Sequence, residues 1–356
     1  MSALPSRLPS SRRVLMQRLE DWLFRTVQLE RGPDCGGVIG STSSVRGPEY
    51  LYPEAAGYFL TWLAFLGSMR GVTPDLSARA FRAATWLSHQ AGDGLTTRRY
   101  LNGEAQDWRN RGLFSFDLAM ACRGVAAVRG WIPQELADEC LDRLLRLFSR
   151  LCPGDGSLMP VLPRTNAKTR DLPCRWSTRP GPYQLKSAAA ILGIPREIAG
   201  IRLHEEMARV YFRWRDHYRE HPADDELHPL LYHIEGLVLG FACGIDDGGL
   251  TVAGALYPTI LRRVRSCARS DVLAQTLRAG CLVPLPTGGH GAMTRPREAL
   301  LGLLEENGAP VSRRVPHGGA RHWNTWSAIF SHQALALLDR VEHGEIPRRA
   351  EMELLA

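Results

Sequence analysis

The sequence has almost no lysine. Of the 44 Lys and Arg residues that give the 356-residue chain a net charge of +7, only two are lysines, Lys168 and Lys186. The arginines are scattered, often beside acidic residues, and no run of five or six like charges occurs. A nucleic-acid surface needs a basic stripe or a known binding motif, so we predict no nucleic-acid partner. The positive excess favours an anionic small molecule or polymer as ligand.

Long apolar runs are also missing. No stretch of about 18 apolar residues occurs, which argues against a membrane-spanning helix and a membrane partner. The N-terminal segment MSALPSRLPSSRRVLMQRLEDWLF lacks the apolar core, about 7–15 residues long, of a secretory signal. We therefore expect a cytoplasmic protein.

The eight cysteines form no metal-binding pattern. There is no C-x-x-C pair, and no cysteine has a histidine at zinc-finger spacing. Several cysteines fall in apolar helical patterns, where a reduced thiol packs as a small hydrophobic group. We predict no metal site and no cofactor.

Strand-like alternation is nearly absent, whereas apolar residues recur at i, i+3, i+4 and i+7 along most of the chain. We divide the chain into a flexible N-terminus (1–13), one helical domain (14–343) and a C-terminal tail (344–356). The period predicts about twelve helices, near 14–30, 53–69, 75–90, 115–129, 133–151, 183–193, 200–219, 229–242, 251–267, 270–281, 296–305 and 322–342.

The predicted helices alternate between two types. Helices of odd rank carry charges at helical spacing, as in ELADECLDRLLRLFSR, whereas most of even rank are nearly uncharged, as in LLYHIEGLVLGFACG. A helix that is apolar on most faces must be surrounded by protein. The alternation predicts an all-α fold, a single (α/α)6 toroid with six inner and six outer helices.

Polar and aromatic residues gather where the inner helices are expected to begin. Inner helices of such a ring run parallel, so their N-termini meet at one end of the central cavity, which the helix dipoles make slightly positive. This end is the predicted site for a polar or anionic ligand. The residues concerned include Tyr52, Glu54, Asp117, Tyr183, Lys186, His228, Asp271, Gln275, His322, Asn324 and Trp326.

Four segments resemble proteins of the six-hairpin glycosidase-like class: YPEAAGYFLTWL (52–63), WLSHQAGDG (86–94), FSFDLAMACRG (114–124) and HPLLYHIEGL (228–237). That class includes unsaturated glucuronyl hydrolases, N-acylglucosamine 2-epimerases and proteins found in polysaccharide biosynthesis. The resemblance extends over about 35–340 and implies the toroid fold and a saccharide substrate. It also aligns Asp117 with a position where glucuronyl hydrolase-like proteins carry a functional aspartate.

Carboxylates in apolar inner helices are the first catalytic candidates, because burial of an unpaired carboxylate is costly. We predict that Asp117 and Glu235 act as acid and base on a glycosidic bond. The alternative is structural: each carboxylate caps a helix or pairs with an inner arginine such as Arg123 or Arg278. Glu54, in a first helical turn, is assigned to substrate binding.

Histidines support a second hypothesis, a sugar epimerase or isomerase. The resemblance to the epimerases implies histidines that remove and return a proton beside a sugar carbonyl, and His233 and His322 are the candidates here. Glu235 follows His233 by two positions, whereas the epimerase pattern has three. A hydrogen-bonded core or cap role is the alternative for each histidine.

The remaining candidates concern substrate contacts. Aromatic faces stack well on sugar rings, and basic groups near the cavity favour an acidic saccharide such as a uronic acid, with Lys186 and Arg278 as the expected contacts. A third hypothesis is a binding or tailoring protein that hydrolyses no sugar, since toroids serve unrelated chemistries. The sequence leaves the oligomeric state open. The predicted substrate-binding set is Tyr52, Glu54, Trp176, Tyr183, Lys186, His228, Gln275, Arg278, Asn324 and Trp326.

Overall fold

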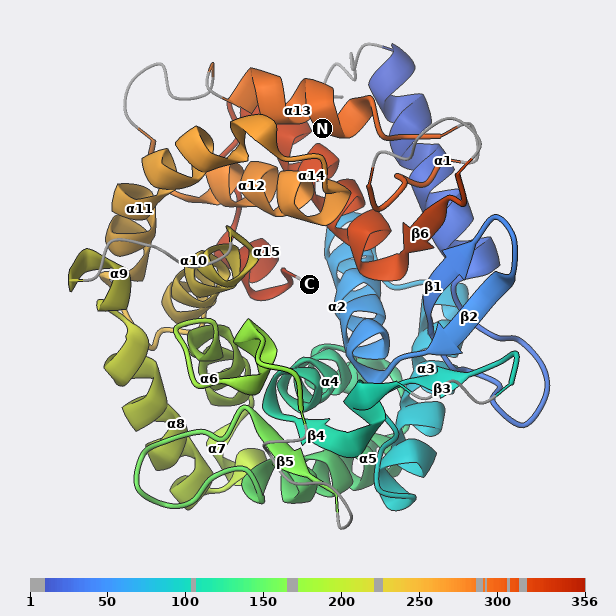
Figure 1. Cartoon of the computed structure of the whole chain (residues 1–356), viewed down its shortest axis with the longest axis vertical. Coiled ribbons are helices and arrows are strands. Elements are labelled where there is room, and N and C mark those ends of the chain that lie inside the picture. Colours follow the sequence, from blue (N-terminus) through green and yellow to red (C-terminus); the bar gives the residue numbers. More distant parts are fainter. Residues whose placement is uncertain are drawn as a thin grey trace.

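The computed structural model describes residues 10–103, 107–164, 172–220, 227–285, 291, 293–305, 308–313 and 319–355. In this part of the chain the helices form a closed ring of two concentric layers (Figure 1). None of the described helices combines the length and hydropathy needed to cross a membrane.

The inner layer consists of the helices predicted to be buried. Nearly every residue of α2 from Pro53 to Gly67 is buried, and α12 is buried along its whole length. A helix with no polar face can only be stable when protein surrounds it. The inner helices are α2 (Pro53–Arg70), α4 (Ser115–Ala127), α6 (Gln184–Leu192), α10 (Leu227–Ala242), α12 (Ser270–Leu282) and α14 (Thr325–Glu342).

The outer helices bury one stripe each, as their charge pattern predicted. In α8, for example, Leu203, Met207, Val210 and Tyr211 face the ring, at the 3–4-residue spacing of one helical face. The outer helices are α1 (Ser10–Thr26), α3 (Pro74–Gly92), α5 (Gln134–Ser149), α8 (Ile201–Trp214), α11 (Gly249–Arg263) and α13 (Thr294–Leu301). The predicted toroid of alternating inner and outer helices is therefore confirmed.

The inner helices α2 and α4 approach each other closely at a pair of glycines. A Cβ atom on Gly57 would overlap the backbone of Met120, and one on Gly124 would overlap the backbone of Gly57. Glycine at both positions therefore allows the two backbones to touch. This contact fixes Glu54 of α2 and Asp117 of α4, one turn or two above it, on neighbouring walls of the ring.

Short strands, which the sequence pattern did not predict, lie at the end of the ring where the inner helices begin. One sheet has the order β3-β2-β1-β6, and β4 pairs with β5. These strands are β1 (Ile39–Ser43), β2 (Gly47–Leu51), β3 (Arg99–Tyr100), β4 (Gly112–Phe114), β5 (Val161–Pro163) and β6 (His322–Asn324).

Strand β6 corrects the predicted helix 322–342. Its residues pair with β1 in antiparallel register, with Asn324 opposite Ser41 and His322 opposite Ser43. Because their backbone groups are used in the sheet, α14 begins only at Thr325, whose hydroxyl donates to the carbonyl of Ile39. The pairing joins the first and last parts of the described ring.

The C-terminal segment is packed against the ring. The short helix α15 (Arg349–Glu353) lies at the centre of the ring in Figure 1. Arg349 donates to the carbonyls of Ala242 (2.6 Å) and Phe241 (2.7 Å) at the C-terminal end of α10, and Gln333 of α14 donates to Leu354 (2.7 Å). The segment therefore lies across the end of the ring opposite the helix N-termini.

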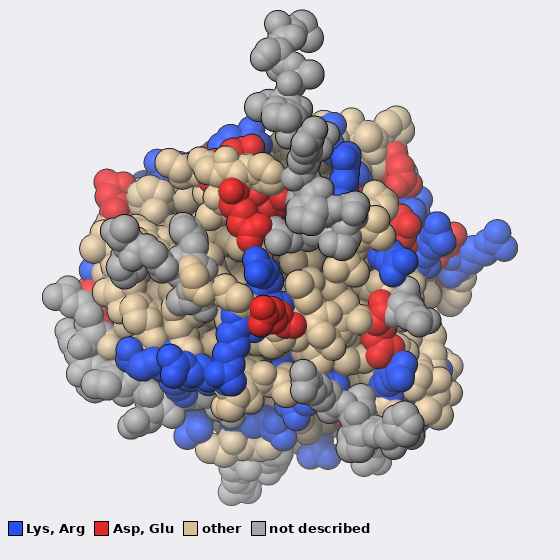
Figure 2. Space-filling view, turned by 90° about the horizontal axis from the view of Figure 1, so that it is seen from above, with Lys and Arg blue, Asp and Glu red and all other residues tan. Residues whose placement is uncertain are grey.

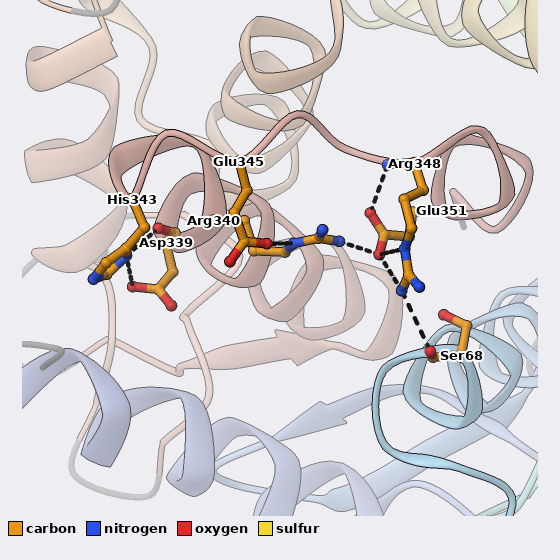
Figure 3. A network of polar contacts seen from close by, with 7 residues as sticks. All are labelled: Ser68, Asp339, Arg340, His343, Glu345, Arg348 and Glu351. Carbon is orange, nitrogen blue, oxygen red and sulfur yellow. Dashed lines mark hydrogen bonds and ion pairs between the residues drawn. The ribbon is translucent and has the colours of Figure 1, made fainter. Parts of the chain in front are cut away.

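A network of charges fixes this segment (Figure 3). Glu351, which is completely buried, binds Arg340 of α14 and accepts from Arg348 (2.7 Å). Arg340 also binds the half-exposed Glu345 (2.7 Å).

On the face seen in Figure 2, charged side chains of both signs are interspersed among uncharged residues.

The N-terminal boundary also differs slightly from the prediction. Residues 1–9, most of the segment predicted to be flexible, lie outside the described residues, as does 356. Helix α1 begins at Ser10, four residues before its predicted start.

Candidate active site

A cavity of about 420 Å³ opens at the end of the ring where the inner helices begin. Every inner helix except α6 contributes a residue of its N-terminal part or of the segment just before it, and the turn Trp176–Thr178 takes the place of α6. The lining residues are Tyr52, Glu54, Thr97, Arg98, Trp108, Arg109, Phe114, Phe116, Asp117, Arg175, Trp176, Ser177, His228, Tyr232, Arg269, Asp271, Arg313 and Trp326.

The cavity brings together six of the residues that were predicted to have a catalytic or substrate-binding role: Tyr52, Glu54, Asp117, Trp176, His228 and Trp326. The others lie outside its lining: Tyr183, Lys186, His233, Glu235, Gln275, Arg278, His322 and Asn324.

Two carboxyl groups, Glu54 and Asp117, form one wall of the cavity. The Tyr52 hydroxyl donates to Oδ1 of Asp117 at 3.3 Å, and the phenols of Tyr52 and Tyr58 hydrogen-bond to Glu54. Burial and the nearby Glu54 charge hold the pKa of Asp117 well above its ordinary value. Burial also raises the pKa of Glu54. Two acids this close do not ionise together readily, so the pair favours a state that retains a proton.

A third carboxyl group, Asp271, lies on a different wall, and its pKa is shifted in the opposite direction. Arg269 donates to both of its oxygens, at 3.1 Å and 2.6 Å, and the Val272 amide donates to Oδ1 at 2.9 Å. Burial alone would raise the pKa of Asp271, but His228 and the Arg269 guanidinium outweigh it and hold that pKa below its ordinary value. Asp271 is therefore an ionised carboxylate at neutral pH.

His228 is a neutral histidine against the aromatic wall. Its ring lies 4.4 Å from that of Tyr232 and 5.7 Å from that of Trp176. Burial lowers its pKa to about 4. Its Nδ1 is buried and has no hydrogen-bond partner among the described residues.

Arginines from loops surround the mouth of the cavity. Arg109 stacks over the Trp108 ring at 4.5 Å, and the Arg175 guanidinium lies 5.8 Å from the same ring. Arg98 is bound to Asp107 at 3.0 Å. The exposed Arg175 and Arg313 form no ion pair within the described residues. Among the described residues, the cations that line the cavity are these arginines together with Arg269, and not Lys186 and Arg278.

Lys186, Glu235 and Arg278 instead form a buried ion cluster outside the cavity lining. Glu235 accepts from Lys186 at 2.8 Å and from Gln275 at 3.1 Å, and it also binds Arg278. The Lys186 and Glu235 side chains are each 1% exposed. Burial would raise the pKa of Glu235, yet Arg278 and Lys186 hold it below the ordinary value. Glu235 thus matches the structural alternative, pairing with an inner arginine, and does not face the cavity.

The two histidines of the epimerase hypothesis lie apart. His233 is completely buried, with Nδ1 3.3 Å from the carbonyl oxygen of Pro182, and burial lowers its pKa to about 4. His322 lies on strand β6 with its side chain 46% exposed, 3.6 Å from Glu49. Within the described residues, His228 is the only histidine that lines the cavity.

Some of the aromatic candidates line the cavity and others are buried outside it. Trp176 packs at 4.9 Å against Tyr183 and at 6.3 Å against Phe116, and Trp326 lies 6.2 Å from Tyr52. Tyr183 is buried behind Trp176 and donates to the carbonyl of Arg179 at 3.2 Å. Asn324 is the residue before α14 and makes no side-chain cap. Trp176 and Trp326 remain as ring surfaces that a saccharide can reach.

Several residues that line the cavity had no role predicted from the sequence. Asp271 was noted at a helix start, and a signal was present, since it forms an R-x-D pair with Arg269 directly before an apolar helix. Tyr232 lies one turn below His228 on α10. Trp108 and Arg109 lie in the short 3-10 helix Trp108–Arg111 and Arg313 forms an isolated β-bridge with Arg269, and neither element is long enough to show a periodicity. Among the described residues, no group of three His, Cys, Asp or Glu is placed to hold a metal ion.

Comparisons with known proteins agree on the architecture. No protein-family model and no curated protein sequence matches the chain. Solved structures do: a D-mannose isomerase (TM-score 0.69, 10% identity, 95% of this chain and 100% of that chain) and the cellobiose 2-epimerase from Spirochaeta thermophila DSM 6192 (0.63, 15%, 95% and 99%). An unsaturated glucuronyl hydrolase specific for heparin also matches (0.60, 11%, 95% and 98%).

The chain has the (α/α)6 toroid fold. The TM-scores establish the architecture, whereas identities this low do not indicate the reaction.

Proposed function

We propose that this toroid is a carbohydrate-active enzyme that hydrolyses a glycosidic bond in an acidic saccharide, with Asp117 as proton donor and Asp271 as base. One observation carries the proposal: a single cavity holds carboxyl groups whose pKa values are displaced in opposite directions. An enzyme that cleaves glycosides needs one carboxyl group protonated and another ionised at the same pH. Asp271 replaces Glu235 as the predicted base, because Glu235 is neutralised outside the cavity.

The proposed reaction follows from these protonation states. Asp117 gives its proton to the glycosidic oxygen as the bond from that oxygen to the anomeric carbon breaks. Asp271 accepts a proton from water while the water oxygen bonds to the same carbon. The products are two saccharides with free hydroxyl groups, and exchange with solvent returns the proton to Asp117. Glu54 supports the donor role, because its charge disfavours ionisation of Asp117.

The arginines at the cavity mouth support an acidic substrate. Arg175 and Arg313 carry charge that no described acid neutralises by an ion pair, and Trp108 holds Arg109 and Arg175 near each other. Arginine binds carboxylate and sulfate groups with two parallel hydrogen bonds. Trp176 and Trp326 supply apolar faces for the sugar rings. A uronic acid or sulfated sugar therefore fits this lining better than a neutral sugar.

The test is incubation of the protein with matched acidic and neutral oligosaccharides in heavy water. Hydrolysis predicts new reducing ends and no deuterium on sugar carbon. Deuterium on carbon without new reducing ends would instead identify the epimerase or isomerase of the second hypothesis. Binding without either change would identify the non-catalytic role.

A further inference from the structure

Lys186 and Glu235 occupy a layer of side chains deeper in the ring than the cavity wall. The Lys186 Nζ atom lies 2.8 Å from Glu235 Oε2, 5.1 Å from the centre of the Tyr58 ring and 4.9 Å from that of the Tyr232 ring. The hydroxyls of Tyr58 and Tyr232 are 3.4 Å apart. Tyr58 hydrogen-bonds to Glu54, so two tyrosines separate the ammonium from the cavity carboxyl pair.

This layer contains more positive than negative charge. The charged groups that act on Lys186 include Glu235 of α10, Arg278 of α12 and Arg123 of α4. Its charge also interacts with Glu54 of α2 and with His228 of α10. Gln275, Gln333, Phe116 and Phe330 are uncharged neighbours in the same cluster. Within the described residues of this layer, three cations (Lys186, Arg278 and Arg123) therefore lie near one carboxylate, Glu235, and all four residues are buried. An excess of buried positive charge stabilises a negative charge close by.

We propose that Lys186 is a positioning residue of this site: its ammonium, fixed by Glu235 beneath the Tyr58–Tyr232 pair, keeps Glu54 ionised and so leaves the proton of the carboxyl pair on Asp117. The Lys186 charge is the leading one among the cations that favour the ionised form of Glu54. Burial lowers the pKa of Lys186 to about 8, so the ammonium form persists at neutral pH.

The use of lysine at this position supports the assignment. The chain has arginine at every other basic position except 168. A guanidinium is planar and wide, whereas an ammonium is a compact point charge that fits among four aromatic rings. A lysine that only neutralised Glu235 would duplicate Arg278, which already binds that carboxylate.

The inference rests on the proposed donor role of Asp117, but its test needs no substrate. The pH at which Asp117 and Glu54 ionise is followed by infrared difference spectroscopy of the protonated carboxyl band, assigned by its loss in Asp117→Asn and Glu54→Gln. The variants compared are Lys186→Met, which removes the cation, and Arg213→Met, which removes an exposed cation from the outer helix α8. Circular dichroism and thermal unfolding establish that each variant is folded.

The two variants should differ. Lys186→Met should raise the pH at which the carboxyl pair gives up its first proton by about one unit, a tenfold change in the ionisation equilibrium. Arg213→Met should leave that pH unchanged. A purely structural role of Lys186 predicts no change in Lys186→Met, and that result would overturn the proposal.

A reciprocal measurement leaves the buried layer intact. Because coupling between two sites is mutual, Glu54→Gln should lower the pKa of Lys186 below its value near 8. With only two lysines in the chain, ¹³C labelling of lysine gives two side-chain signals, and Lys168→Arg identifies the one from Lys186. An unchanged Lys186 titration in Glu54→Gln would overturn the proposal even if Lys186→Met failed to fold. Coupling in a protein that cleaves no saccharide would instead refute the hydrolase function alone.

Discussion

The hydroxyl of Tyr52 lies 3.3 Å from Oδ1 of Asp117, although 65 residues separate the two in the chain. Tyr52 precedes α2, and Asp117 lies in the first turn of α4, so parallel neighbouring inner helices create the contact. The same phenol also hydrogen-bonds to Glu54. Tyr52 thus links the two acids whose shared proton the proposed reaction uses.

Removal of this hydroxyl is the first prediction. The hydrogen bond from Tyr52 favours ionised Asp117, so Tyr52→Phe should raise the pKa of Asp117 further. The alkaline limb of the pH–rate profile should move to higher pH by up to about one unit, with a fall in kcat of about tenfold or less. The control is Tyr50→Phe, a buried tyrosine of β2 outside the cavity lining. An alkaline limb that moved equally in both variants would contradict the assignment.

The arginines at the mouth give a prediction about charge. Arg175→Gln should raise KM for an acidic saccharide about tenfold and leave kcat unchanged, because the contact is the same in ground and transition states. The effect should shrink as salt screens the interaction, and a matched neutral saccharide should show none. Arg213→Gln, on the outer helix α8, is the control. An equal loss for both saccharides, independent of ionic strength, would exclude an acidic substrate.

The C-terminal segment predicts a difference between two glutamates that bind Arg340. Glu351 is buried and Glu345 is 50% exposed. Glu351→Gln should lower the free energy of unfolding by about 1–3 kcal/mol. This is less than the loss expected for a fully buried ion pair, because the arginine partners of Glu351 are partly exposed. Glu345→Gln should cost at most about 0.5 kcal/mol. Urea unfolding at neutral pH measures both.

The pH dependence adds a check on Glu351. Burial would raise its pKa, but Arg348 and Arg340 hold the pKa of Glu351 below the ordinary value. The stabilisation is therefore present above pH 4.5, the unfolded value, and is lost as the pH falls through the folded one. The difference in free energy of unfolding between wild type and Glu351→Gln should therefore narrow as the pH falls over that range. A constant difference would mean that packing, and not charge, is responsible.

Two buried histidines predict a loss of stability in mild acid. Burial lowers the pKa of both His228 and His233 from 6.5 to about 4. Between these values the unfolded chain binds more protons than the folded one, so stability rises with pH and falls as the pH drops from 6.5 to 4. His233→Gln should reduce the loss in free energy of unfolding between pH 6.5 and 4 by about 1–3 kcal/mol. His89→Gln, an exposed histidine on α3, should leave the slope of the melting temperature against pH unchanged.

The fold was predictable because a single sequence shows both the helical periodicity and the alternation of charged with uncharged helices. Charged stripes on helices such as α8 and uncharged helices such as α10 identify the two layers without any knowledge of contacts. The strands were not predictable in the same way, since those of two to five residues, such as Arg99–Tyr100, are too short for an alternation. Their pairing depends on neighbours distant in sequence, as between β1 and β6.

The end of the ring that holds the cavity was predictable from the sequence. Which residues line the cavity and which lie in the buried layer behind it was not. Convergence of the inner helix N-termini correctly grouped Tyr52, Glu54 and Asp117 at one cavity. Glu235 shares a face of α10 with His228, yet seven residues at about 1.5 Å each place it about 10 Å deeper along the helix. Arg278 is displaced from Asp271 by the same seven residues on α12. Helical phase alone does not distinguish a cavity wall from the buried layer behind it.

The most direct test of the hydrolase account compares the pH–rate profiles of wild type, Asp117→Asn, Asp271→Asn and Glu235→Gln on an acidic oligosaccharide. The measured quantity is kcat/KM for the release of reducing ends from pH 3 to 9. The wild-type profile should be bell-shaped, with an acid limb from Asp271 and an alkaline limb from Asp117. Asp117→Asn and Asp271→Asn should each lower the rate by about 10²–10⁴-fold, with loss of the limb concerned. A folded Asp271→Asn variant that kept full activity, with the acid limb unmoved, would contradict the account.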